Sequence, residues 1–229
     1  MRPQGPALIS LIMLVAANLV PLFGVLYLGW SVFDVLLLFW MENIVIGVFN
    51  VMRLGTRLVK MDEPEILLLI PFFAFHYGLF TAAHGVFVMS LFGPKDIAGM
   101  VDGSASLTGA FTTLAKLLAT DLGYAWALLG LVLSHGVSFV INFLGRGEYR
   151  QVSANQLMHG PYPRIVVLHC TIILGGMMVQ ALGAPVYAVI ILVLVKIIVD
   201  AIAHLRERVL LRPATSPPSI STSLHRRGE

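Results

Sequence analysis

The stretch ILLLIPFFAFHYGLFTAAHGVFVMSL, residues 66–91, carries no Asp, Glu, Lys or Arg and decides the class of the fold. A helix needs about 20 predominantly apolar residues to cross roughly 30 Å of hydrocarbon, and this stretch exceeds that length. Runs of this kind predict six spans, near residues 7–28, 31–52, 66–91, 122–145, 164–184 and 186–205. The alternating pattern of a membrane β-barrel is absent from the sequence. We therefore predict an all-α fold, a polytopic membrane bundle of about six transmembrane helices.

The overall composition agrees with a membrane protein. Of the 229 residues, 58% are hydrophobic and only 12% are charged, whereas soluble domains are about a quarter charged. In a six-span arrangement the basic residues fall on one side, apart from Lys95 and Lys116, which predicts that both termini are cytoplasmic. Topology and attraction to anionic lipid thus account for the formal charge of +3. We expect membrane lipid as a partner and no nucleic acid.

The chain ends and the longest connection differ from the spans in composition. The first span has no small-residue cleavage site after a short apolar core, which favours a retained helix over a removed signal peptide. Between Gly93 and Asp121, apolar residues recur at helical spacing and predict an outer amphipathic helix over about 104–121, which lies at the interface or acts as a lid. Residues 1–210 then form the transmembrane domain. The Pro/Ser-rich residues 211–229 cannot bury a core and predict a disordered cytoplasmic tail.

Every predicted span after the first contains ionisable or amide side chains. An ionisable group at the centre of a span costs about 2.5–3.5 kcal/mol on insertion scales, so several of them together indicate a shared function. Their spacing puts the members of each set on one face of a helix, and such faces turn inward in lipid. The candidate residues are Glu42, Asn43, His76, His84, His135, Asn142, His169, Lys196, Asp200 and His204.

Six of these residues are candidate metal ligands, because imidazole and carboxylate groups on facing helices commonly hold zinc, iron or manganese in helical bundles. Counting from the basic helix ends puts three at mid-membrane: Glu42, His76 and His135. The other three then lie about 8 Å nearer the cytoplasm: His169, Asp200 and His204. A divalent or transition metal is the expected cofactor, with zinc or iron first. A thiolate cage is excluded, since Cys170 is the only cysteine.

The remaining polar residues are expected to support this site. Asn43 and Asn142 would orient ligands through hydrogen bonds. Lys196 lies one helical turn from Asp200 and would neutralise it as an ion pair. His84 shares a face with His76 but lies roughly 12 Å further along the helix, which suits a proton relay better than a common metal ion.

Five motifs carry a resemblance to a known family: FWMEN (39–43), FHYGLFTAAHG (75–85), SHGVSFVINF (134–143), RIVVLHCTIILGG (164–176) and KIIVDAIAH (196–204). With these the chain resembles a bacterial integral-membrane family, domain of unknown function 6498, up to about Arg208. The resemblance implies a multi-pass protein of the bacterial inner membrane and no activity. The segments ENIVIGVFN and SHGVS are also similar to membrane zinc hydrolases of the ceramidase and progestin-receptor type. The chain departs from that pattern in helix number and in the last span.

The same residues fit several functions. A membrane metalloenzyme acting on a lipid-like substrate would use a metal-bound water or oxygen, with Glu42 or Asp200 as the catalytic base. A proton-coupled transporter or proton relay would pass protons between Glu42, His76, His84 and Asp200. A b-type haem held by His76 and His135 is a third arrangement. A purely structural network accounts poorly for six groups, because polar contacts in membranes average about 0.6 kcal/mol.

Overall fold

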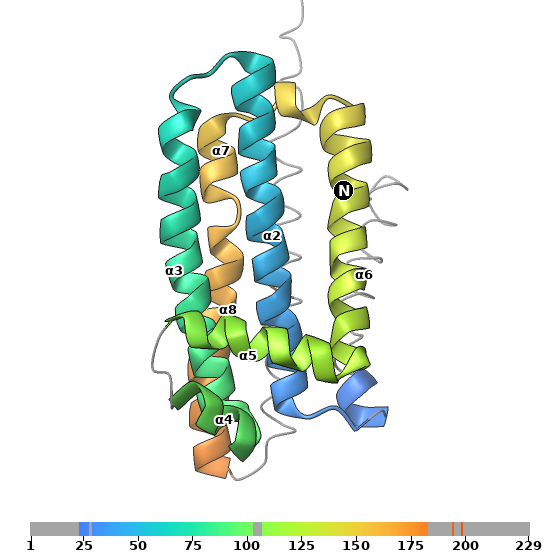
Figure 1. Ribbon diagram of the computed structural model, residues 1–229, viewed down its shortest axis with the longest axis vertical. Coiled ribbons are helices and arrows are strands. Elements are labelled where there is room, and N and C mark those ends of the chain that lie inside the picture. The colour runs from blue at the N-terminus through green and yellow to red at the C-terminus, as the bar shows by residue number, and fades with distance from the viewer. Residues whose placement is uncertain (1–22, 28, 103–106, 183–193, 195–197, 199–229) are drawn as a thin grey trace, which may run out of the picture.

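The computed structural model describes residues 23–27, 29–102, 107–182, 194 and 198. Throughout this part of the chain the regular elements are helical, which confirms the all-α prediction there. The helices α2 (Val32–Met61), α3 (Ile66–Phe92) and α6 (Leu122–Ser138) run along the long axis of the molecule (Figure 1). Beside them α8 (Tyr162–Leu182) follows the short α7 (Ala154–His159). In Figure 1, α2 stands between α6 on one side and α3 on the other.

Three helices in the described residues are long and apolar enough to cross a membrane: Val32–Met61, Ile66–Phe92 and Leu122–Gly145. They begin where the sequence predicted spans 31–52, 66–91 and 122–145, but α2 continues about nine residues further. The third span joins α6 to a π-helical segment, η1 (Phe139–Gly145). The predicted spans near 7–28 and 186–205 lie almost wholly outside the described residues, as do Lys196, Asp200, His204 and the tail.

The start and end of α2 follow from local side-chain chemistry. Oγ of Ser31 accepts from the backbone N–H of Asp34 at 3.2 Å, and Oδ2 of Asp34 accepts from the backbone N–H of Ser31 at 2.7 Å. This capping box satisfies donors that the first helical turn leaves open. At the other end Asp62 adopts a left-handed conformation, with φ 53°, and stops the helix.

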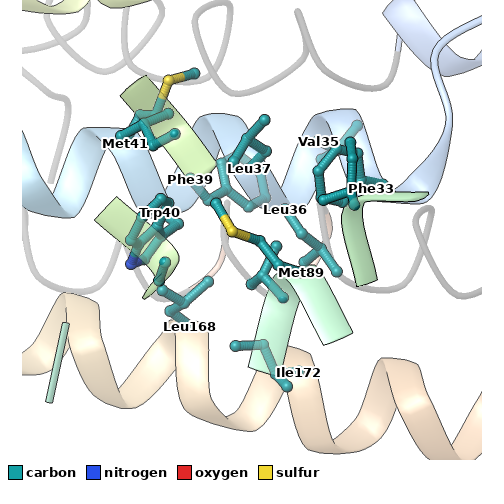
Figure 2. Packing of buried hydrophobic residues seen from close by; sticks show 14 residues of the cluster. Phe33, Val35, Leu36, Leu37, Phe39, Trp40, Met41, Met89, Leu168 and Ile172 are labelled. Carbon is teal, nitrogen blue, oxygen red and sulfur yellow. The ribbon is translucent and has the colours of Figure 1, made fainter. Parts of the chain in front are cut away.

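The interface between α2 and α3 is fixed by an aromatic ring seated over a glycine. Trp40 is fully buried, and its Nε1 donates to the carbonyl oxygen of Thr81 at 2.7 Å. A Cβ added to Gly85 would lie 2.2 Å from the Trp40 ring, so only glycine permits this approach. Figure 2 shows that Met89 of α3 lies next to Leu36, and that Leu168 of α8 lies near Trp40. Three helices thus share one core.

Two helices cross the bundle at the end where Trp40 packs on Gly85. The helix α5 (Leu107–Thr120) runs across the long helices, with α4 (Lys95–Asp102) beside it (Figure 1). Ala110 and Leu114 of α5 are buried in the same core as Trp40, and the Phe111 ring lies 5.7 Å from the Trp40 ring. The helix α5 falls within the stretch expected to be amphipathic, about 104–121, whereas α4 was not predicted.

A buried arginine joins the connecting segments at the opposite end of the bundle, where α2 leads into α3. Arg57 of α2 is only 5% exposed and forms an ion pair with Glu63 in the connection to α3. Its guanidinium also donates to the backbone carbonyl oxygens of Tyr149 and Val152, which follow η1. We call these residues the Arg57 clasp. It holds the connections α2–α3 and α6–α7 together and satisfies a charge that would otherwise be costly to bury.

The element formed by α7 and α8 is a broken helix. Pro161 has no N–H to continue α7, and Pro163 lies in the first turn of α8, where a missing N–H costs little. Nδ2 of Asn50 on α2 donates to the carbonyl oxygen of Leu157 at 2.9 Å, and Leu157 itself is buried. The helix α7 therefore packs against α2 through Leu157 and Met158, while Asn155, Gln156 and His159 are exposed. The break that follows it lies alongside the middle of α2.

Candidate functional site

Two histidine hydrogen bonds join α3 to α8. Nδ1 of His76 lies 2.8 Å from the hydroxyl oxygen of Tyr162, and Nε2 of His84 lies 3.0 Å from Nδ1 of His169. The two pairs are eight residues apart on α3 and seven apart on α8, which is about 12 Å and 10 Å along the helix axes. We call these four residues the α3–α8 seam. Here the structure brings two histidines of α3 into direct contact with titratable side chains of α8.

The pair of His84 and His169 combines a buried ring with an exposed one. His84 is only 3% exposed, whereas His169 is exposed. The two rings lie edge to face, with centroids 5.1 Å apart and an interplanar angle of 76°. Nδ1 of His84 is also 2.6 Å from the carbonyl oxygen of Phe80, one turn earlier on α3. The buried ring is thus held at both nitrogens.

The pair of His76 and Tyr162 lies in an aromatic environment. The His76 ring stacks on Phe72 at 5.5 Å and contacts Phe80 at 5.1 Å. Tyr162 packs edge-on against Phe73. Sequence reasoning did not single out Tyr162, although its place between Pro161 and Pro163 marks the start of a helix.

An ion pair lies close to the helix break. Nη1 of Arg164 on α8 donates to Oε1 of Glu42 on α2 at 3.0 Å. The side chains are 42% and 21% exposed, respectively. Residue counting had put Arg164 at the cytoplasmic edge, but Glu42 is eleven residues, or about 16 Å, from Arg53 along α2. The ion pair puts Arg164 level with Glu42, because α7 occupies the length of α2 beside which a continuous α8 would have lain.

The depth predicted for His169 also differs from the structure. Counting put His169 about 8 Å nearer the cytoplasm than His76. Instead it pairs with His84, which lies eight residues beyond His76 toward the Phe92 end of α3. The broken helix again explains the error.

Asn43 contacts α3 rather than a carboxylate. The hydroxyl of Tyr77 donates to the backbone carbonyl oxygen of Asn43 at 3.0 Å and lies 3.4 Å from its side-chain oxygen. Nδ2 of Asn43 donates to the carbonyl oxygen of Phe39 at 2.9 Å. Gly47 makes room for Tyr77, since an added Cβ would lie 2.6 Å from the ring. Asn43 therefore positions Tyr77 beside the seam.

The polar residues of α6 lie apart from the seam. His135 stacks on Phe49 of α2, with ring centroids 6.3 Å apart. Nδ2 of Asn142, in η1, donates to Oγ of Ser138 at 3.4 Å. Because α6 packs against α2 on the side away from α3 (Figure 1), these residues face a different interface from His84 and His169.

The described candidates form pairs rather than a cluster. Within the residues that the structure describes, no three His, Cys, Asp or Glu side chains are close enough together to hold a metal ion. Glu42 forms an ion pair with Arg164, and His135 stacks on Phe49. His76 is hydrogen-bonded to Tyr162, and His169 is hydrogen-bonded to His84. The predicted ligands Asp200 and His204 and the predicted partner Lys196 lie outside the described residues.

Comparison with known proteins gives one match. A family described as "Family of unknown function (DUF6498)" matches residues 1–217 of the chain. No curated protein and no solved structure matches the chain. The match confirms the resemblance carried by the five motifs, whereas similarity to zinc hydrolases of the ceramidase type is not shown. Function must be inferred from the seam and its neighbours.

Proposed function

We propose that the protein carries protons through the core of a multi-pass bundle in the bacterial inner membrane. The chain belongs to this family of unknown function, so the proposal is based on its own side chains. The protein serves as a proton relay or as the proton pathway of a coupled transporter. The observation that carries the proposal is the α3–α8 seam, with its two histidine hydrogen bonds between facing helices. The bundle has six spans and cytoplasmic termini.

The surface of the described helices supports a membrane location. Large apolar side chains such as Leu68, Phe75 and Leu133 are more than half exposed, which is costly in water and favourable in lipid. Arg53 and Lys60 lie on α2 toward the Arg57 clasp, so that end is cytoplasmic under the positive-inside rule. The end crossed by α5 then faces outward.

The chemistry of the seam supports proton transfer. Histidine changes its charge near neutral pH, so small changes in its surroundings move a proton on or off. Ionisable residues inside membranes characteristically mark ion and proton pathways. The pairs are about 12 Å apart along α3, which is more than a hydrogen bond, so transfer between them needs water or ring movement.

The broken helix supports coupling to a transported solute. In secondary transporters, helices interrupted inside the membrane supply polar groups to the transport site. Here the break between α7 and α8 lies beside Tyr162, which bonds to His76, and Arg164, which bonds to Glu42. A movement of α8 would change both contacts together.

Proton flux in liposomes tests the proposal. Purified protein is reconstituted, a potassium diffusion potential is imposed with valinomycin, and an internal pH dye reports acidification. We expect proton entry with the unmodified chain, and entry at the rate of empty liposomes with His84→Gln and with His169→Gln. His225→Gln is the matched control, because His225 lies beyond residues 1–217, which the family matches. Flux that survives both seam variants would overturn the proposal.

A metalloenzyme acting on a lipid-like substrate is the second candidate, favoured by one contact. A histidine that binds a metal typically donates its other N–H to a carbonyl, as Nδ1 of His84 does to Phe80. Zinc or iron held by His84 and His169 would activate water or oxygen, with Glu42 or Asp200 as the base. Metal content by mass spectrometry of protein in detergent decides this. Stoichiometric metal lost in both His84→Ala and His169→Ala supports the enzyme, and metal-free protein after incubation rejects it.

A further inference from the structure

We propose that Lys60 and Arg150 together bind the phosphate group of an anionic phospholipid at the Tyr149 ring, beside the Arg57 clasp. The inference goes beyond the proposed function and does not depend on proton transfer. Three features support it. The two cations share one aromatic ring, neither forms an ion pair within the described part of the chain, and both lie where a membrane-crossing segment ends.

The Tyr149 ring is a fixed support for the two cations. Tyr149 is only 7% exposed and belongs to η2 (Glu148–Arg150), a single 3₁₀ turn. Its ring packs against Phe143 of η1, with centroids 6.2 Å apart, and its carbonyl oxygen accepts a hydrogen bond from the buried Arg57 of α2. The ring therefore keeps its place relative to both η1 and α2.

Two cations from different elements lie over this ring. Nζ of Lys60, in the last turn of α2, is 5.3 Å from the ring centroid, and the guanidinium carbon of Arg150 is also 5.3 Å from it. An aromatic face attracts cations at this distance. The two charges therefore lie within twice this distance of each other. Like charges this close repel, and an anion bound by both would remove the repulsion.

Both cations have donors that a phosphate can use. Nε of Arg150 donates to the Tyr149 hydroxyl at 3.1 Å, which leaves the two terminal nitrogens of the guanidinium for a ligand. Within the described part of the chain, the exposed carboxylates of Asp62 and Glu148 form no ion pair with either cation. A guanidinium can bind two phosphate oxygens at once, and the ammonium of Lys60 adds a point charge.

The position of the two cations favours a membrane lipid over a soluble phosphate. Lys60 is next to the last residue of α2, and Arg150 follows shortly after the span Leu122–Gly145. The ends of spans lie at the level of the lipid head groups, where tyrosine is enriched. In the proposed orientation this is the cytoplasmic leaflet, whose surface is anionic. Val59 and Ile141, both more than half exposed on these two segments, are apolar surface for acyl chains.

A bound phosphate would link α2 to η2 at the surface. The Arg57 clasp links the same two segments inside the bundle, through the carbonyl oxygen of Tyr149. Tyr149 therefore lies between a buried link and a lipid link. Because a ligand that binds only the folded chain stabilises it, the lipid would stabilise this end of the bundle.

Native mass spectrometry of the chain in detergent, titrated with lipid, tests the site. The lipids are phosphatidylglycerol, which is anionic, and phosphatidylcholine, which has no net charge, with identical acyl chains. We expect the first phosphatidylglycerol to bind at least about tenfold more tightly than phosphatidylcholine, as one charge-assisted contact would give. Lys60→Gln and Arg150→Gln should each weaken the binding of phosphatidylglycerol by about tenfold.

Arg146→Gln is the matched control. Arg146 is exposed on the same connection as Arg150 and carries the same charge, but the cations over the Tyr149 ring are Lys60 and Arg150. Its loss should change the affinity for phosphatidylglycerol by less than about twofold, as for an exposed charge outside the site. Inorganic phosphate in excess should leave the lipid bound.

Three results would overturn the site. Equal binding of the two lipids would show that the phosphate charge is not recognised. An equal loss of affinity in Arg146→Gln would show general attraction by surface charge. Displacement of the lipid by inorganic phosphate would identify a soluble phosphate as the ligand. The first and third results come from the unmodified chain, so loss of folding in a variant does not obscure them, and none depends on proton flux.

Discussion

Glu42 and Arg164 compensate each other's charge inside the bundle, and their partial exposure sets the size of the effect. Exposed ion pairs contribute about 0–1 kcal/mol, whereas removing one partner of a buried pair costs about 3–5 kcal/mol. Side-chain exposures of 21% and 42% put this pair between these limits. Each residue therefore stabilises the contact between α2 and α8 in part by neutralising the charge of the other.

A double-mutant cycle measures this dependence. We expect Glu42→Gln and Arg164→Gln each to lower the free energy of unfolding, and the double variant to lose less than the sum. The coupling should be about 0.5–3 kcal/mol, as for residues in direct contact. Thermal unfolding in detergent provides the readout. Additive losses would show that the two side chains do not interact.

Gly85 and Gly78 give a matched comparison on one helix. Gly85→Ala places a Cβ 2.2 Å from Trp40, whose ring is fully buried and bonded to Thr81, so we expect a loss of about 1–3 kcal/mol from overpacking. Gly78→Ala meets nothing within 4 Å and should be neutral or stabilise by up to about 1 kcal/mol. Equal effects on the unfolding temperature would contradict the tight approach of α3 to α2.

Residue types were easier to predict than their partners. The cost of ionisable groups in lipid singled out Glu42, His76 and His84, and all three form polar contacts with α8. Tyr162 and Arg164 were not foreseen as their partners. Helical spacing gives the face on which a residue lies, but the rotation and register of the facing helix decide which side chains meet.

At the scale of elements, the Arg57 clasp fixes how α2 ends against the α6–α7 connection. Arg57→Lys keeps the charge but cannot reach Glu63, Tyr149 and Val152 at once, because an ammonium lacks the planar fork of donors. We expect faster amide hydrogen exchange in residues 146–153, with little change in α3. Lys95→Met is the control, since Lys95 is exposed on α4 at the opposite end of the bundle. Unchanged exchange in Arg57→Lys would contradict the clasp.

The long helices could be predicted from sequence, whereas the broken one could not. Continuous apolar runs predicted the starts of α2, α3 and the α6–η1 span within a few residues, although α2 ends about nine residues beyond the prediction. The break between α7 and α8 was not predicted, and α7 packs against α2 through Asn50 and Leu157. Burial of a short polar helix depends on partners more than a hundred residues away, which local patterns do not contain.

At the scale of the whole molecule, orientation in the membrane is open to direct test. With Cys170→Ser as background, we expect Lys116→Cys on α5 to react with a membrane-impermeant maleimide in intact spheroplasts. Arg150→Cys, beside the Arg57 clasp, should react only after permeabilisation. The physical reason is the excess of basic residues at the clasp end. The reverse pattern would place that end outside.

The close packing of Trp40 on Gly85 fixes the position of α3 along α2. If α3 shifted along α2 by one residue, about 1.5 Å, the Trp40 ring would collide with a residue that has a Cβ. We therefore expect α2 and α3 to move together as one rigid unit. The helix α8 packs against α2 and α3 through its buried apolar residues Ile165, Leu168 and Ile172. It also makes polar contacts with them, which are directional and can re-form in a new position. A movement of α8 against α2 and α3 would therefore have to re-form its polar contacts and repack these three apolar side chains, whereas the contact between α2 and α3 would stay fixed.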